Sequence, residues 1–67
     1  MKPKEIRAAL ILAEVHIKTI AKRMGCSQSL VHKVINGERF NAEVRAELAK
    51  TIARAEDDIW PPQQQAA

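Results

Sequence analysis

Four polar side chains recur on one side of residues 28–35, the segment QSLVHKVI. Val31 and Val34 are apolar and would face inward if this segment were an α-helix, which turns the polar set toward solvent. Glutamine can pair with two atoms of adenine, lysine can reach guanine or a phosphate, and serine suits either base type. Histidine donates or accepts according to its tautomer and protonation. The segment therefore predicts that base contacts in a DNA major groove come from Gln28, Ser29, His32 and Lys33. The alternative is that these four are ordinary solvated polar residues.

Basic residues concentrate around the same segment. Residues 17–37 hold four basic residues and no acidic one, in a chain of 67 residues with a net charge of +3, whereas residues 38–67 hold more acidic than basic residues. Such a local excess of positive charge can meet phosphates, although an ordinary solvated helix face would look the same. Phosphate contacts, which position a protein without reading sequence, are expected from Lys18, Lys22, Arg23, Asn36 and Arg39 and from backbone N–H groups at the start of residues 28–35.

Two short helices joined by a tight turn must position these side chains. Gly25 can adopt the left-handed conformation that ends a helix, and Ser27 can cap the helix that follows. Ala21 lies where the two helices cross, so its side chain has to be small. Ile20, Ala21, Met24, Cys26, Val31 and Val34 are expected to point inward. This spacing is typical of a helix-turn-helix.

Two further helices are expected to complete the core. Pro3 suits the first turn of one, and Asn41 can cap the other. Their apolar stripes are Ile6, Ala9, Leu10 and Ala13 in the first, and Val44, Leu48, Ile52 and Ala55 in the second. Trp60 is expected to fold back onto the core, with a contact to a partner as the alternative.

Catalysis has little support in this sequence. Cys26 is the only cysteine, and neither it nor the two histidines show the spacing of a metal site, a redox pair or a nucleophile. No enzyme activity, cofactor, metal or small-molecule ligand is therefore expected, and the small core leaves no room for a sizeable substrate pocket. With no signal peptide or membrane-spanning run, the chain is expected in a reducing cytoplasm.

The segment from Ile20 to Gly37 resembles the DNA-binding domains of phage lambda-type repressors and Cro-like proteins. The resemblance is closer to the Ner-like group of small phage regulators, because AEDDIWP at residues 55–61 is similar to that group's acidic Ile-Trp-Pro ending. It implies an all-α fold, a compact four- to five-helix bundle, and repression of phage or prophage promoters in a bacterial host, near the nucleoid. His16-Ile17 replaces the family's Ser-Gln, so the phosphate contact of that glutamine is not carried over. Ala53-Arg54-Ala55 replaces a Gly- and Pro-containing stretch and is expected to let the preceding helix run longer.

The sequence thus predicts one DNA-binding domain over residues 3–62 and a disordered polar tail over residues 63–67. The expected partner is double-stranded DNA, bound by a homodimer, because one recognition helix reads too few base pairs. Leu12, Phe40 and the Ile59-Trp60 segment are the candidates for the dimer contact. The alternative function is a small protein-interaction module, an antitoxin or a co-regulator, that binds DNA only weakly.

Overall fold

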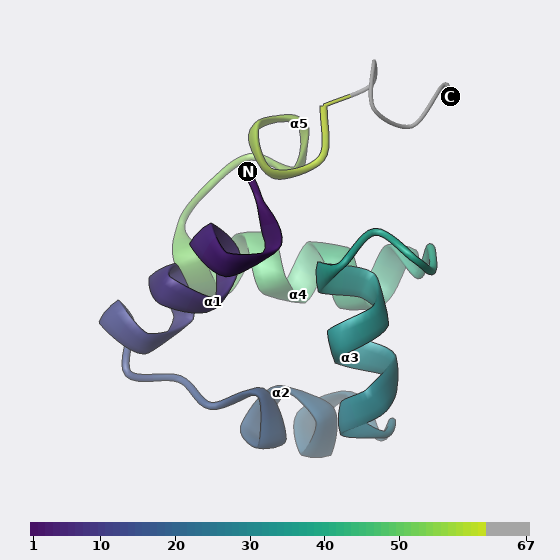
Figure 1. Ribbon diagram of the computed structural model, residues 1–67. Helices are drawn as coiled ribbons and strands as arrows, with labels where there is room; N and C mark the ends of the chain where they lie inside the picture. Colours follow the sequence, from purple (N-terminus) through teal and green to yellow (C-terminus); the bar gives the residue numbers. More distant parts are fainter. Residues whose placement is uncertain (62–67) are drawn as a thin grey trace.

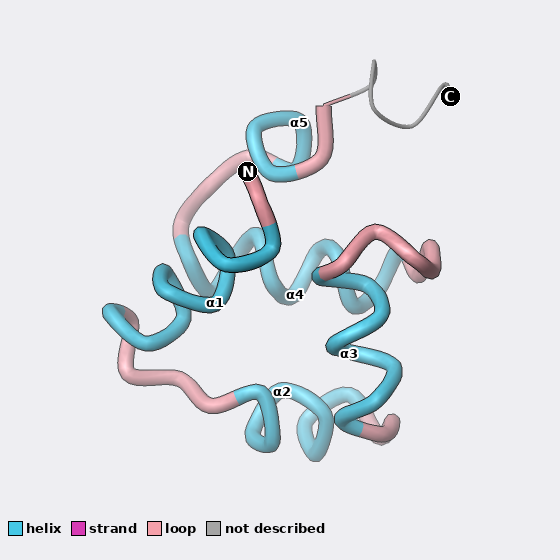
Figure 2. The backbone as a smooth tube through the Cα atoms, in the orientation of Figure 1, coloured by secondary structure: helices cyan, strands magenta, loops and turns pink. Residues whose placement is uncertain are grey.

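Helices surround a single core in the computed structural model of this protein, which describes residues 1–61 (Figure 1). They are α1 (Pro3–Leu12), α2 (Ile17–Met24), α3 (Gln28–Ile35), α4 (Ala42–Ile52) and α5 (Glu56–Ile59). Loops of a few residues join them, and no strand occurs within this part of the chain (Figure 2). The prediction of an all-α fold is confirmed for residues 1–61, whereas the expected tail lies outside the described residues.

The start of α1 is fixed by its own first turn. Pro3 occupies the first position, where its missing N–H costs nothing. The backbone N–H of Lys2 donates to the Glu5 carboxylate at 2.6 Å, and this hydrogen bond holds the pKa of Glu5 below its ordinary value. The helix ends at Leu12, so Ala13, expected on the apolar stripe, lies beyond it and is exposed. Within α1, the core receives its side chains from Ile6 and Leu10.

Side chains from all five helices fill the core. Its apolar members are Ile6, Leu10, Ile20, Ala21, Val31, Val34, Ile35, Val44, Leu48, Ala49, Ile59 and Trp60. Met24 and Cys26, both predicted to point inward, are half-buried and pack against this cluster. Trp60 is only 8% exposed, which confirms the prediction that it folds back onto the core.

A buried arginine, which the apolar pattern did not indicate, sits beside Trp60. The Arg45 guanidinium carbon lies 4.4 Å from the centre of the Trp60 ring and 4.9 Å from that of Phe40. Cation–π attraction between a guanidinium and two aromatic rings stabilises a positive charge that would otherwise be costly to bury. Arg45 thus links α4 to the residue that follows α5.

The helix α4 ends earlier than the sequence predicted. The Ala53-Arg54-Ala55 segment was expected to extend it, but Ala53 takes the left-handed conformation with φ of 57° and ends the helix at Ile52. Ala55 is consequently outside the helix and exposed. The physical reason is tertiary, since the chain must reverse here for Ile59 to reach the core, where none of its surface is exposed. The ammonium group of Met1 donates to the Ile59 carbonyl oxygen at 2.9 Å and joins the first residue to α5.

Candidate functional site

The turn between α2 and α3 has the conformation that the sequence predicted. Gly25 ends α2 with φ of 68°, and the backbone N–H of Cys26 donates to the Ala21 carbonyl at 2.9 Å. The Ser27 hydroxyl accepts from the backbone N–H of Leu30 at 3.1 Å and caps α3. Ala21 is 3% exposed, as required for a residue at a close helix crossing. The turn therefore fixes the direction in which α3 leaves α2.

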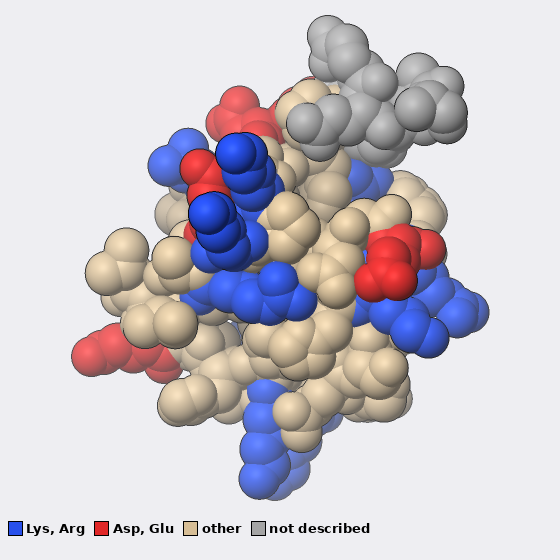
Figure 3. Space-filling model, in the orientation of Figure 1, with Lys and Arg blue, Asp and Glu red and all other residues tan. Residues whose placement is uncertain are grey.

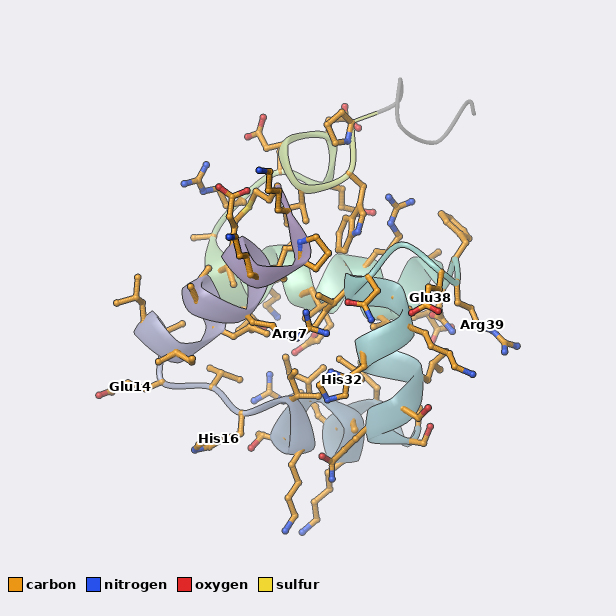
Figure 4. The ribbon with its side chains drawn as sticks, in the orientation of Figure 1. Arg7, Glu14, His16, His32, Glu38 and Arg39 are labelled. Atoms are coloured by element: carbon orange, nitrogen blue, oxygen red, sulfur yellow. The ribbon has the colours of Figure 1, made fainter. Side chains whose placement is uncertain are left out.

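The outward face of α3 carries the residues expected to read bases. Gln28 and Ser29, in the first turn, and Lys33, in the second, are exposed to solvent. His32 is half-buried and lies toward α1 (Figure 4). Leu30, for which a base contact and a core position were both open, packs half-buried against the core. Gln28, Ser29 and Lys33 thus lie on the open edge of α3, whereas His32 lies on the edge that faces α1.

Arg7 of α1 joins the site, although sequence reasoning did not include it among the candidate residues. Its Nη2 atom donates to the Asn36 side-chain oxygen at 2.9 Å and lies 3.4 Å from His32 Nδ1. His32 and Asn36 stand four residues apart, so they occupy the same side of α3 and its C-terminal cap. Figure 4 shows Arg7 and His32 facing each other across the space between the helices. The signal available in the sequence is that Arg7 precedes Leu10 by one turn, at the edge of the apolar stripe.

Some of the residues expected to bind phosphates have side chains without a partner among the described residues, and others already have one. Lys18 and Lys22 are exposed on α2 and make no side-chain hydrogen bond or ion pair in the described structure. Asn36 is engaged on both sides, since its Nδ2 atom donates to Glu38 at 3.1 Å while its oxygen accepts from Arg7. Arg39 is exposed in the loop after α3, where Figure 4 shows it next to Glu38.

Arg23, the remaining phosphate candidate, is ion-paired. Its Nη1 atom lies 2.5 Å from Glu47 Oε2, which connects the end of α2 to α4. The arginine side chain is 55% exposed and the glutamate only 16%. Because the arginine end of the pair is open to solvent, the pair contributes about 1 kcal/mol or less to stability. Arg23 could bind a phosphate only by sharing or leaving Glu47, whereas Lys18 and Lys22 have no such competitor.

Figure 3 shows how the charged side chains are distributed over one face of the molecule. Lysine and arginine side chains appear at the top, centre, bottom and right of the face shown there, and acidic groups lie at its top and left and in one patch at the right beside basic side chains. The acidic residue nearest to α3 along the chain is Glu38, which already accepts from Asn36. Neither α2 nor α3 contains an acidic residue, so a polyanion approaching these two helices meets mostly positive charge.

An open groove runs beside this face. It has a volume of about 330 Å³. Its lining comprises Arg7, Leu10, Ile11, Val15, His16, Ile17, Lys18 and Gln28. The groove is larger than the sequence suggested, and its volume lies at the small end of the range for ligand sites. The lining contains no carboxylate, thiol or hydroxyl, so it offers an apolar floor with a cationic and amide rim.

Residues 1–61 show neither a metal-binding cluster nor a membrane-spanning helix. No three histidine, cysteine, aspartate or glutamate residues come close enough there to hold a metal ion. None of the helices in that range has the length and apolar character needed to cross a membrane. Comparisons with models of protein families, with curated proteins and with solved structures found no match to this chain. Any functional assignment consequently depends on the geometry of α2, α3 and the residues around them.

Proposed function

We propose that this chain is a sequence-specific transcriptional regulator, acting as a phage or prophage repressor, that binds double-stranded DNA through a lambda repressor-like helix-turn-helix formed by α2 and α3. The observation that carries the proposal is the capped start of α3. Ser27 fixes this end of the helix, and Gln28 and Ser29 project from it into solvent. A helix in this position can enter a major groove about 12 Å wide with its first turn toward the base edges.

The charges around α3 support the same function. Lys18 and Lys22 lie on the preceding helix with their ammonium groups available, and Lys33 is exposed on α3 itself. The positive end of the α3 dipole and its first-turn N–H groups favour a phosphate at the same edge. In the proposed complex Gln28, Ser29, His32 and Lys33 contact bases, while Lys18, Lys22 and Arg39 contact the DNA backbone.

The experiment that tests this function is selection of bound sequences from a random DNA duplex pool. We expect a short motif to emerge, bound at least about 10³-fold more tightly than random duplex. The control is Gln28→Ala, which should weaken discrimination at one position of the motif. Recovery of no common motif would overturn the proposal and favour the protein-interaction module, the alternative function open from the sequence.

The same proposal includes a homodimer on a two-fold operator. Burial of Ile59 and Trp60 in the core withdraws that segment from the candidate contacts. Leu12 and Phe40 remain, at 85% and 68% exposed, and Ile11, next to Leu12, is 75% exposed. Two protomers would read half-sites about 10 bp apart, or a multiple of that spacing. The mass of the complex on the selected site tests this point, and a single copy on a motif without a repeat would contradict it.

A further inference from the structure

The contact between Arg7 and His32 determines more than the packing of α1 against α3. We propose that Arg7 sets the tautomer of His32 and thereby selects which bases α3 accepts at one position of its DNA site. Arg7 acts here as a positioning residue, and His32 is the residue that touches the base. The inference rests on the proposed function, but its first step concerns the protein alone.

The chemistry of the two side chains assigns the proton. An arginine guanidinium has only donors and stays charged, so it cannot accept a hydrogen bond from an imidazole. With Arg7 Nη2 at 3.4 Å, His32 Nδ1 can act only as an acceptor. A neutral imidazole carries one proton, which must then reside on Nε2. His32 therefore presents an N–H donor on the side of its ring away from Arg7.

Two further hydrogen bonds hold Arg7 in place. The Asn36 oxygen accepts from Arg7 at 2.9 Å, and the Asn36 amide nitrogen donates to Glu38 at 3.1 Å. The carboxylate of Glu38 can only accept from an amide, which orients Asn36 with its oxygen toward Arg7. Glu38, Asn36, Arg7 and His32 thus form one chain of hydrogen bonds in which each donor has a defined acceptor. Because the 3.4 Å contact is the longest of the three, the shorter bond to Asn36 is what keeps the guanidinium beside the ring.

A fixed donor on His32 discriminates among bases. Guanine offers two acceptors in the major groove, adenine N7 and thymine O4 offer one each, and cytosine offers only its amino donor. His32 held with Nε2–H should therefore prefer guanine and reject cytosine. If the proton could reside on Nδ1 instead, Nε2 would accept a hydrogen bond from the cytosine amino group. Removing Arg7 should consequently admit cytosine at the position that His32 reads.

The tautomer is measured without DNA, by ¹⁵N–¹H correlation spectra of the histidine rings at about pH 8, above the ordinary histidine pKa of about 6.5. His16 is an internal control, because it is exposed at the start of α2 and makes no side-chain hydrogen bond there. We expect His32 in the parent to show the Nε2–H form alone. In Arg7→Met and in Asn36→Ala, His32 should show a mixture of forms, while His16 stays unchanged. Equal His32 spectra in parent and variants would overturn the proposal.

The effect on base choice is measured by repeating the duplex selection with Arg7→Met and with Arg7→Lys. At one position the parent should bind cytosine about 5- to 150-fold more weakly than guanine, the range of a single mismatch. Arg7→Met should reduce that ratio to about 2-fold or less, and Arg7→Lys, which keeps a charged donor, should restore part of it. A changed tautomer with an unchanged base preference would overturn the role in recognition. A parent that selects no motif would instead refute the proposed function, whatever the spectra show.

Discussion

Replacing Gly25 tests the geometry that aims α3. Gly25 has φ of 68°, and a Cβ atom built on it would meet no other atom within 4 Å. An alanine there therefore meets no steric obstacle, and its cost is that of the left-handed backbone alone. For an L-residue that cost is about 1–2 kcal/mol. The smaller freedom of the unfolded Gly25→Ala chain returns about 0.4–1 kcal/mol, which leaves a net loss of about 1 kcal/mol.

The order of stability among Gly25 variants follows from the same reasoning. Gly25→Asn should cost least, because asparagine tolerates the left-handed region, and Gly25→Val most, at about 3 kcal/mol. In thermal melts followed by circular dichroism, a loss of 1 kcal/mol should lower Tm by about 4–8 °C. Gly37→Ala is the matched control, since Gly37 has φ of 78° and equally open surroundings. Melting of Gly25→Val at the temperature of the parent would refute the reasoning.

Four other variants extend these expectations. Ala21→Leu should destabilise the fold by about 1–3 kcal/mol through overpacking at the α2–α3 crossing, and a denaturant titration in which it matches the parent would show that the helices tolerate separation there. Gln28→Ala should cost about 1–3 kcal/mol of binding free energy on the selected duplex and little on random duplex. Lys22→Ala should weaken binding to both duplexes alike. Equal losses for Gln28→Ala on the two duplexes would mark Gln28 as a backbone contact. Because its hydrogen bond to Lys2 lowers the pKa of Glu5, the ionised carboxylate stabilises α1 at neutral pH, and this contribution should disappear as the pH falls through the folded-state pKa. The difference in Tm between the parent and Glu5→Ala should accordingly shrink between about pH 6 and pH 3, and a difference that stayed constant would contradict that role.

Local sequence rules account for the turn and for the caps. Gly25 and Ser27 adopt the predicted conformations because each depends on its own residue type and its immediate neighbours. Asn41 likewise caps α4, accepting from the Val44 N–H at 3.1 Å. The end of α4 was predicted wrongly because alanine favours a helix locally, whereas the burial of Ile59 and Trp60 after the turn makes the chain reverse direction at Ala53.

Long polar side chains account for what the sequence did not reveal. Arg7 reaches α3 and Arg45 reaches two aromatic rings, yet neither contributes to an apolar periodicity. Apart from Phe40, which lies close to Arg45 in the chain, their partners lie far away in sequence, so spacing within one helix carries no information about them. The ion pair of Arg23 with Glu47 was missed for the same reason. Side-chain placement across helices is therefore the part of the site that required a structure.

The salt dependence of DNA binding tests the central claim most directly. Affinity for the selected duplex should fall as salt rises, with a log–log slope of about −0.9 for each phosphate neutralised. If Lys18 and Lys22 each neutralise one phosphate, their double alanine variant should have a slope shallower by about 1.8, while Lys50→Ala, which removes an exposed cation from α4, should keep the parent slope. Weak binding at every salt concentration, or an unchanged slope in the double variant, would contradict the assignment of α2 and α3 as the DNA-binding surface.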